Sequence, residues 1–152
     1  MGVLSALFAV FGLDLLTKEW ADRTLPLNQK KKIVKNRLYF WHIKNSGIAY
    51  NRFSGKRNGI LLFTGSLLAY YSVLFVKVLL GKKDKRYGLP LALTLGGGYG
   101  NFLERAAKGK VTDFLFIPIE GRNAPIFNLA DLAIGVGAFW LTIISCGEKE
   151  KK

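Results

Sequence analysis

Long apolar runs alternate with polar segments along the chain. Residues 60–80 and 129–146 are mostly apolar. The first run is broken by Lys77, whose long side chain can reach the membrane interface from a position near one end. Roughly 20 apolar residues are needed for a helix to cross a bilayer, and both runs approach this length. Two further runs are shorter. Residues 2–16 end near charged positions, and residues 87–103 are rich in glycine. The pattern predicts four membrane-spanning helices.

We therefore predict a mainly α, integral membrane protein with four transmembrane helices and a small extracytoplasmic β element. The first run lacks a basic segment before it and contains Asp14, so we expect a retained helix and not a signal peptide. A single membrane-embedded domain should occupy residues 1–152. Its spans are expected at about residues 2–20, 60–80, 88–104 and 127–146, and its surface loops at residues 21–59 and 105–126.

The first surface loop predicts a hairpin. Two runs rich in aromatic and β-branched residues, RLYFWHIK at 37–44 and IAYNRF at 48–53, flank a turn signal at 45–47. We expect this hairpin to lie at the membrane surface, and we assign His42 a structural role. Residues 111–117, VTDFLFI, predict a further short strand.

The net charge of +13 favours a negatively charged partner. Beside apolar spans, anionic lipid headgroups explain a basic cluster more simply than nucleic acid does, so we predict no nucleic-acid binding. The loops on one side of the four spans hold fourteen Lys and Arg residues, against seven on the other side. That bias alone would place the large loops in the cytoplasm. Cys146 is the only cysteine, which excludes an intramolecular disulfide and a cysteine cluster for metal.

Asp131 is the carboxylate inside the last apolar run, where a charge is costly enough to need a reason. Asn128, three residues earlier, has the position of a helix N-cap to which Asp131 can reach back. Asn128, Asp131 and Gly135 share one helix face. A capping box at the start of a membrane helix and a functional site both remain open on this stretch alone.

Other polar pairs lie one helical turn apart. Asp14 and Lys18 can form an ion pair that pins helices or can belong to a site. Asn101 and Arg105 share a face at the end of the third span, where Arg105 could reach lipid phosphates or orient a carboxylate. The glycines at 96–100 allow close helix packing and lack the residues that complete a phosphate loop.

Asp113 lies in the short strand that feeds, through a turn, the helix bearing Asp131. This connection can bring the two carboxylates together. Two close carboxylates share a proton, so that one activates water while the other protonates a scissile carbonyl. The helix N-terminus favours the ionised form of Asp131, which leaves the shared proton on Asp113. We predict an aspartic site that requires no metal and no other cofactor.

The motifs that carry these residues occur together and in order. They are DLLTK at 14–18, NSGIAY at 45–50, GNFLER at 100–105, VTDF at 111–114 and FNLAD at 127–131. In order and spacing the chain resembles lipoprotein signal peptidase, the signal peptidase II family, from the first helix to the last.

The resemblance implies an aspartic endopeptidase that removes signal peptides from prolipoproteins before a diacylglyceryl-modified cysteine. It implies that Asp113 and Asp131 are catalytic and that seven further residues support them or contact substrate: Asp14, Lys18, Asn45, Gly47, Asn101, Arg105 and Asn128. The expected partners are the prolipoprotein and membrane lipids, and the enzyme is predicted to be a monomer. The resemblance also implies a multi-pass protein of the bacterial cytoplasmic membrane, with the large loops and active site near the extracytoplasmic face. This orientation is opposite to the one that the count of Lys and Arg in the loops favours.

Four residues depart from the family pattern. Glu104 stands where aspartate is usual, and Leu132 stands where serine is common. Ile48 and Tyr50 replace smaller or plain aromatic residues. These changes bear on substrate fit and leave both aspartates intact.

Two other functions compete with the peptidase. A small proton- or ion-coupled membrane carrier could use Asp14, Lys18 and Asp131 as a relay, and Asp113 would then be dispensable. A catalytically silent family member could bind lipoproteins without cutting them. Neither explains why VTDF and FNLAD occur together.

Overall fold

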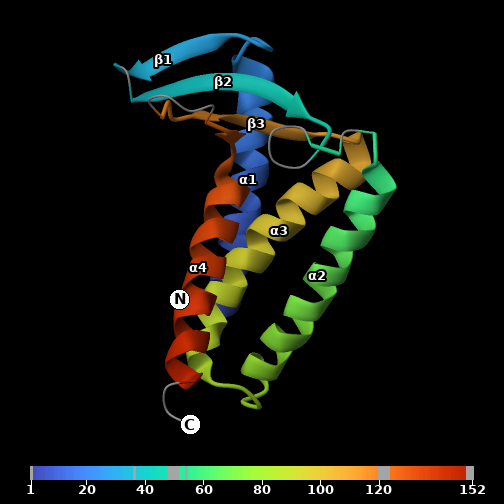
Figure 1. Cartoon of the computed structure of the whole chain (residues 1–152), viewed down its shortest axis with the longest axis vertical. Helices are drawn as coiled ribbons and strands as arrows, with labels where there is room; N and C mark the ends of the chain where they lie inside the picture. The colour runs from blue at the N-terminus through green and yellow to red at the C-terminus, as the bar shows by residue number, and fades with distance from the viewer. Residues whose placement is uncertain (1, 36, 48–51, 54, 120–123, 150–152) are drawn as a thin grey trace.

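The computed structural model describes residues 2–35, 37–47, 52–53, 55–119 and 124–149. Within these residues the chain is mostly helical, with a small antiparallel sheet across one end of the helices (Figure 1). The elements in chain order are α1 (Val3–Thr24), β1 (Lys30–Val34), β2 (Leu38–Asn45), α2 (Arg57–Leu79), the short 3-10 helix η2 (Lys85–Tyr87), α3 (Gly88–Lys108), β3 (Val111–Phe116), β4 (Ile126–Phe127) and α4 (Leu129–Lys149).

Helix α3 is the centre of the bundle and packs against α1, α2 and α4. Its glycines make this possible, as the sequence predicts. A Cβ added at Gly96 would lie 2.7 Å from the carbonyl oxygen of Leu7 in α1, and one at Gly97 would lie 2.5 Å from that of Ala130 in α4. Backbones at this spacing leave no room for a side chain.

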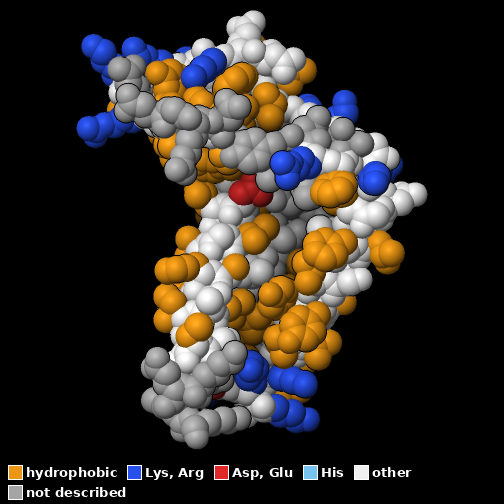
Figure 2. Space-filling model, viewed as in Figure 1, with side chains coloured by type: hydrophobic (Ala, Val, Ile, Leu, Met, Phe, Trp, Pro, Cys, Tyr) orange, Lys and Arg blue, Asp and Glu red, His pale blue; other side chains and the backbone are white. Residues whose placement is uncertain are grey.

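Two helices, α2 and the segment Leu129–Gly147 of α4, are long and apolar enough to cross a membrane. Among the described residues, α1 and α3 do not meet the same test of length and hydropathy. Four spanning helices therefore stay a prediction. Figure 2 shows hydrophobic side chains along the outer surface of the helices, with Lys and Arg gathered toward the two ends of the molecule.

The sheet has the order β1-β2-β3-β4. The predicted strand at 111–117 is confirmed by β3, but the predicted hairpin is wrong. β2 pairs with β1 and β3, while residues 48–51 lie outside the described part of the chain and Arg52 and Phe53 lie in a turn. The lysine run thus forms an edge strand. A cation–π contact supports it, since the Lys30 ammonium is 4.1 Å from the ring centre of Tyr39 on the neighbouring strand.

Candidate active site

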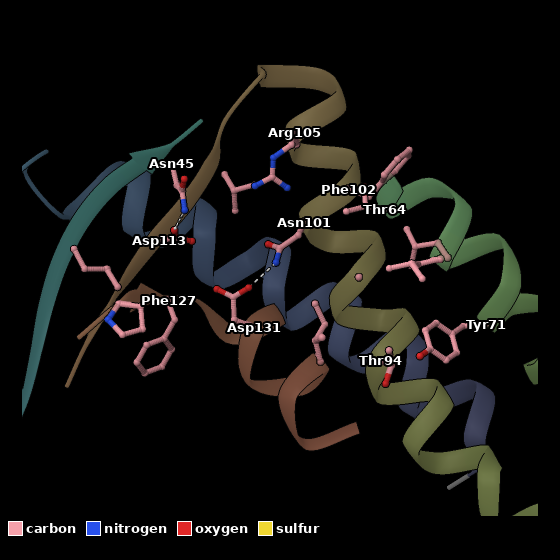
Figure 3. Close-up of a pocket in the computed structure, with 17 residues that line it drawn as sticks. Asn45, Thr64, Tyr71, Thr94, Asn101, Phe102, Arg105, Asp113, Phe127 and Asp131 are labelled. Carbon is pink, nitrogen blue, oxygen red and sulfur yellow. Dashed lines mark hydrogen bonds between the residues drawn. The ribbon is translucent and has the colours of Figure 1, made fainter. Parts of the chain in front are cut away.

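The predicted site residues gather where the sheet meets the ends of α3 and α4. A cavity of about 470 Å³ opens there, and Asp113, Asp131, Asn45, Asn101 and Arg105 all line it (Figure 3). Figure 2 shows acidic side-chain atoms in a hollow just below the sheet. Below these polar groups the lining becomes apolar and runs between α2, α3 and α4.

Asp113 lies on β3 with a side chain only 3 % exposed. Two amide groups hold its carboxylate: Asn45 Nδ2 donates to Oδ2 at 3.0 Å, and Asn128 Nδ2 donates to Oδ1 at 2.8 Å. Burial raises the pKa of Asp113 to about 7, and the nearby charge of Asp131 acts in the same direction. A carboxyl of this kind can hold a proton at neutral pH.

Asp131 lies in the first turn of α4 and is open to the cavity. The predicted N-cap is confirmed in both directions. Asp131 N–H donates to Asn128 Oδ1 at 2.9 Å, and Asn128 N–H donates to Asp131 Oδ2 at 3.1 Å. Asn101 Nδ2 donates to the other carboxylate oxygen at 2.8 Å. The capping box is therefore part of the site, so the two readings of this stretch are compatible.

Asn128 joins the two aspartates. Its side-chain amide donates to Asp113 while its backbone N–H donates to Asp131, and the residue is fully buried. A strand and the helix that follows it thus converge on one asparagine. The expectation that the turn between them brings the two carboxylates to one place agrees with this geometry.

Asp14 and Lys18 form a buried ion pair, with 2.7 Å between Lys18 Nζ and Asp14 Oδ2. Asp14 Oδ1 accepts from the backbone N–H of Ala130, which ties α1 to α4. Lys18 also donates to Asn101 Oδ1 at 2.7 Å, and Asn101 in turn contacts Asp131. The pair therefore pins helices and supports the site at once.

Arg105 is buried and lines the cavity, and its predicted role in support of the two aspartates stays a prediction. Its side chain is too enclosed to reach lipid phosphates, and the hydrogen bond described for it goes to a backbone carbonyl, Gly47 O, at 2.8 Å. Gly47 N–H donates to Asn45 Oδ1 at 3.0 Å, which orients the amide that holds Asp113. Arg105 therefore anchors the backbone at Gly47, immediately after the end of β2 that carries Asn45.

The structure shows a residue behind the site that the sequence analysis missed. Thr112, next to Asp113, is fully buried, and its hydroxyl donates to Glu104 Oε1 at 2.6 Å. Its place in the predicted strand, on the opposite face from Asp113, was the available signal. Of the departures from the family pattern, Leu132 is 46 % exposed and contributes nothing to the cavity lining, whereas Ile48 and Tyr50 lie outside the described residues.

The described residues include no group of three or more His, Cys, Asp or Glu side chains placed to hold a metal ion. The chemistry that the cavity offers is that of its two carboxyl groups, one buried and one open, with amides and an arginine around them.

Comparison with known proteins shows the family of the chain. The model of the family described as Signal peptidase (SPase) II matches residues 6–146. The chain is similar to the lipoprotein signal peptidase of Bacillus subtilis (strain 168), with 31 % identity over 149 residues and 94 % of each chain covered. It is equally similar to that of Bacillus pumilus (strain SAFR-032), with 31 % identity over 147 residues, 95 % of this chain and 94 % of the relative.

Two solved structures of bacterial membrane enzymes share the fold. One has a TM-score of 0.85 and 25 % identity, with 99 % of this chain and 90 % of that chain covered. The other has a TM-score of 0.78 and 25 % identity, with 93 % and 90 % covered. The family match includes the helices, the sheet and both aspartates. The chain therefore belongs to the signal peptidase II family of proteases.

Proposed function

We propose that the protein removes signal peptides from prolipoproteins by cutting before a diacylglyceryl-modified cysteine, with Asp113 and Asp131 as the catalytic pair. The observation that carries the proposal is the position of Asn128, which contacts both carboxylates at the head of an apolar cavity. The family membership and the names of the relatives supply the substrate class.

In the proposed mechanism Asp113 holds a proton and Asp131 is ionised. The raised pKa of Asp113 and its burial favour this assignment, as does the helix N-terminus at Asp131. Asp131 accepts a proton from water as the water oxygen bonds to the scissile carbonyl carbon, while Asp113 gives its proton to the carbonyl oxygen. When the C–N bond breaks, Asp131 passes its proton to the leaving nitrogen and Asp113 recovers one from the tetrahedral intermediate.

Arg105 and Lys18 supply positive charge to this pair. Arg105 lines the cavity and interacts electrostatically with both aspartates. Lys18 is shared with Asp14 and Glu104, so much of its charge is already balanced. One negative charge on the pair therefore suits the surroundings better than two, which agrees with a single shared proton.

The apolar part of the cavity fits a substrate that remains in the bilayer. Leu67 and Tyr71 of α2, Phe102 of α3 and Ile134 of α4 are among the residues that line it. An acyl chain or the apolar part of a signal peptide can lie between these helices while the peptide bond reaches the polar head of the cavity.

The membrane arrangement belongs to the same proposal. All four helices would span the bacterial cytoplasmic membrane, with the sheet and active site at the extracytoplasmic face and both termini in the cytoplasm. The exposed lysines of β1 would meet lipid headgroups, and the enzyme would act as a monomer. The apolar exposed surface of α2 and α4 supports this placement.

Cleavage of a diacylglyceryl-modified prolipoprotein by the purified protein in lipid tests the proposal. Wild type should cut before the lipidated cysteine, whereas Asp113→Asn and Asp131→Asn should each abolish cutting while the protein stays folded. Asp84→Asn, which changes an exposed carboxylate in the loop after α2, is the matched control and should keep full activity. Full activity in Asp113→Asn would overturn the aspartic mechanism and favour the carrier, and a wild type that binds without cutting would favour the silent binder.

A further inference from the structure

A second polar cluster lies behind the strand that carries Asp113. Side chains alternate along a strand, so Thr112 points to the opposite face from Asp113, toward α1 and the end of α3. Four further residues surround it there: Asp22, Lys44, Glu104 and Lys108. None of them contacts the cavity that holds the two aspartates.

Thr112 is bonded through every polar group it has. Its hydroxyl donates to Glu104 Oε1 at 2.6 Å, and its backbone N–H donates to Glu104 Oε2 at 3.1 Å. The hydroxyl accepts from Lys44 Nζ at 2.6 Å, and the backbone carbonyl accepts from Asn128 Nδ2 at 3.3 Å. Asp22 Oδ1 lies 3.3 Å from the same hydroxyl. Since a hydroxyl has only one proton to donate, Asp22 accepts its hydrogen bond from Lys44 instead.

Charged contacts tie this cluster to three elements around β3. Lys44 Nζ on β2 lies 2.5 Å from Asp22 Oδ1 on α1. Lys108 on α3 lies 3.5 Å from Asp22 and 3.4 Å from Glu104. Glu104 also lies 3.4 Å from Lys18, which reaches the active site through Asn101. Removal of one partner would leave a buried group without its hydrogen bond.

The strand ladder alone does not fix the position of Asp113. The register between β2 and β3 shifts between Phe40 and Ile43, so the pairing is irregular immediately before the Ile43 and Asp113 pair. Bulges of this kind are able to re-aim a side chain. The contacts of the neighbouring residue, Thr112, can therefore fix the position of this part of β3, which regular strand pairing would otherwise fix.

We infer that Thr112, Glu104 and Lys44 are positioning residues that hold β3 so that the Asp113 carboxylate meets Asn45 and Asn128. The inference rests on the proposed function for its link to activity. This inference gives Glu104 a role. From the C-terminal part of α3, its two carboxylate oxygens accept hydrogen bonds from the hydroxyl and the backbone N–H of Thr112.

Replacement of Thr112 by valine tests this inference, because valine keeps the β-branched shape and removes the hydroxyl. With the anchor gone, the Asp113 carboxylate should contact Asn45 and Asn128 less closely. Both of these hydrogen bonds lower its pKa, so the pKa of Asp113 should rise by about one unit. Among the described residues, Asp131, Lys18 and Arg105 are the charged groups that face Asp113, and none of them is changed. Misplacement of the carboxyl should lower kcat by about 10-fold to 100-fold, with KM within about twofold.

Two readouts separate positioning from general stability. The alkaline limb of the pH–rate profile should move to higher pH in Thr112→Val, and carbon NMR titration of aspartate-labelled protein, assigned with Asp113→Asn, should show the same shift. Thr112→Ser keeps the hydroxyl and should restore the wild-type pKa and rate. Thr142→Val, which removes an exposed hydroxyl bonded within α4, is the matched control and should change neither.

An unshifted titration with unchanged kcat in folded Thr112→Val would overturn the inference. If that variant does not fold, Lys44→Met removes one donor to the same hydroxyl and should give a smaller shift in the same direction; no shift there would count equally against it. Wild-type protein that fails to cut would refute the proposed function alone, because the NMR titration needs no cleavage.

Discussion

Helices α2 and α3 lie side by side and differ in almost every other respect. Eleven of the 21 residues of α3 are buried, including Glu104 and Arg105, whereas four of the 23 residues of α2 are buried and all four are apolar. Of the two, only α2 is long and apolar enough to cross a membrane. The helix with the clearer membrane signal is thus the one that contributes less to the polar site.

This difference has a physical reason. A lipid-facing helix is selected for apolar surface, whereas a helix surrounded by others needs small residues for close packing and can hold polar groups that find partners. Hydropathy therefore reports lipid exposure and does not report chemistry. Substitutions matched between the α3 side and α2 should show the same asymmetry.

Lys18→Met should have the largest effect. Its buried ammonium contacts Asp14, Asn101 and Glu104, so its loss leaves the buried Asp14 carboxylate without its cation, at a cost of about 3–5 kcal/mol. Lys77→Met, in the last turn of α2 and exposed, should change stability by less than about 0.5 kcal/mol. Unfolding in lipid–detergent micelles measures both, and equal losses would break the comparison.

The pH dependence of stability should follow Asp113. Because burial raises the folded-state pKa of Asp113 to about 7, its contribution is fully present below the ordinary value of 3.8 and is lost as pH rises through about 7. The slope in this window is at most about 1.4 kcal/mol per pH unit. Thermal unfolding from pH 4 to 8 should show this slope in wild type and in Asp84→Asn. A slope that persists unchanged in Asp113→Asn would assign it to another group.

Gly97→Ala should destabilise the protein by about 1–3 kcal/mol and lower the cleavage rate, because the added methyl meets the Ala130 carbonyl at the start of α4. Gly59→Ala in α2 is the matched change. Apart from its chain neighbours and the nearby backbone of α2, no described atom lies within 4 Å of the added Cβ there, so stability should stay constant or rise by up to about 1 kcal/mol. A harmless Gly97→Ala would mean that α3 and α4 can separate without loss.

Ser72→Ala should have the smallest effect. The Ser72 hydroxyl shares a hydrogen bond of 2.9 Å with the Tyr99 hydroxyl, which joins α2 to α3, and such bonds between membrane helices contribute about 0.6 kcal/mol. Ser66→Ala removes a hydroxyl bonded only within α2 and should change stability less. A double-mutant cycle with Tyr99→Phe isolates the shared bond, and a coupling of zero would show that α2 is held by apolar packing alone.

The features that the sequence predicted are local. Asn128 and Asp131 are three positions apart and Asp14 and Lys18 are four apart, so helical geometry alone suggests each pair. The strand at 111–116 and the close packing of the α3 glycines follow from patterns of similar length.

The features that the sequence did not predict are long-range. Arg105 and Gly47 are 58 positions apart, and Lys44 and Thr112 are 68 apart. Nothing in a local pattern indicates that the lysine run at Lys30–Val34 pairs with β2, because lysines suit a solvated loop equally well. The prediction that Asp113 and Asp131 are catalytic rests chiefly on motif resemblance, with local chemistry as support.

The two roles of Asn128 couple fraying at the start of α4 to loss of the carboxylate pair. The residue caps α4 and holds both carboxylates, so fraying of the first helical turn also dismantles the carboxylate pair. The backbone N–H of Asp131 donates to the Asn128 side chain and is protected from exchange while this contact holds. Its hydrogen exchange therefore reports opening of the first turn of α4. Its rate of hydrogen exchange gives the fraction of molecules whose active site is momentarily disassembled, and this fraction limits how much of the enzyme is ready to meet substrate.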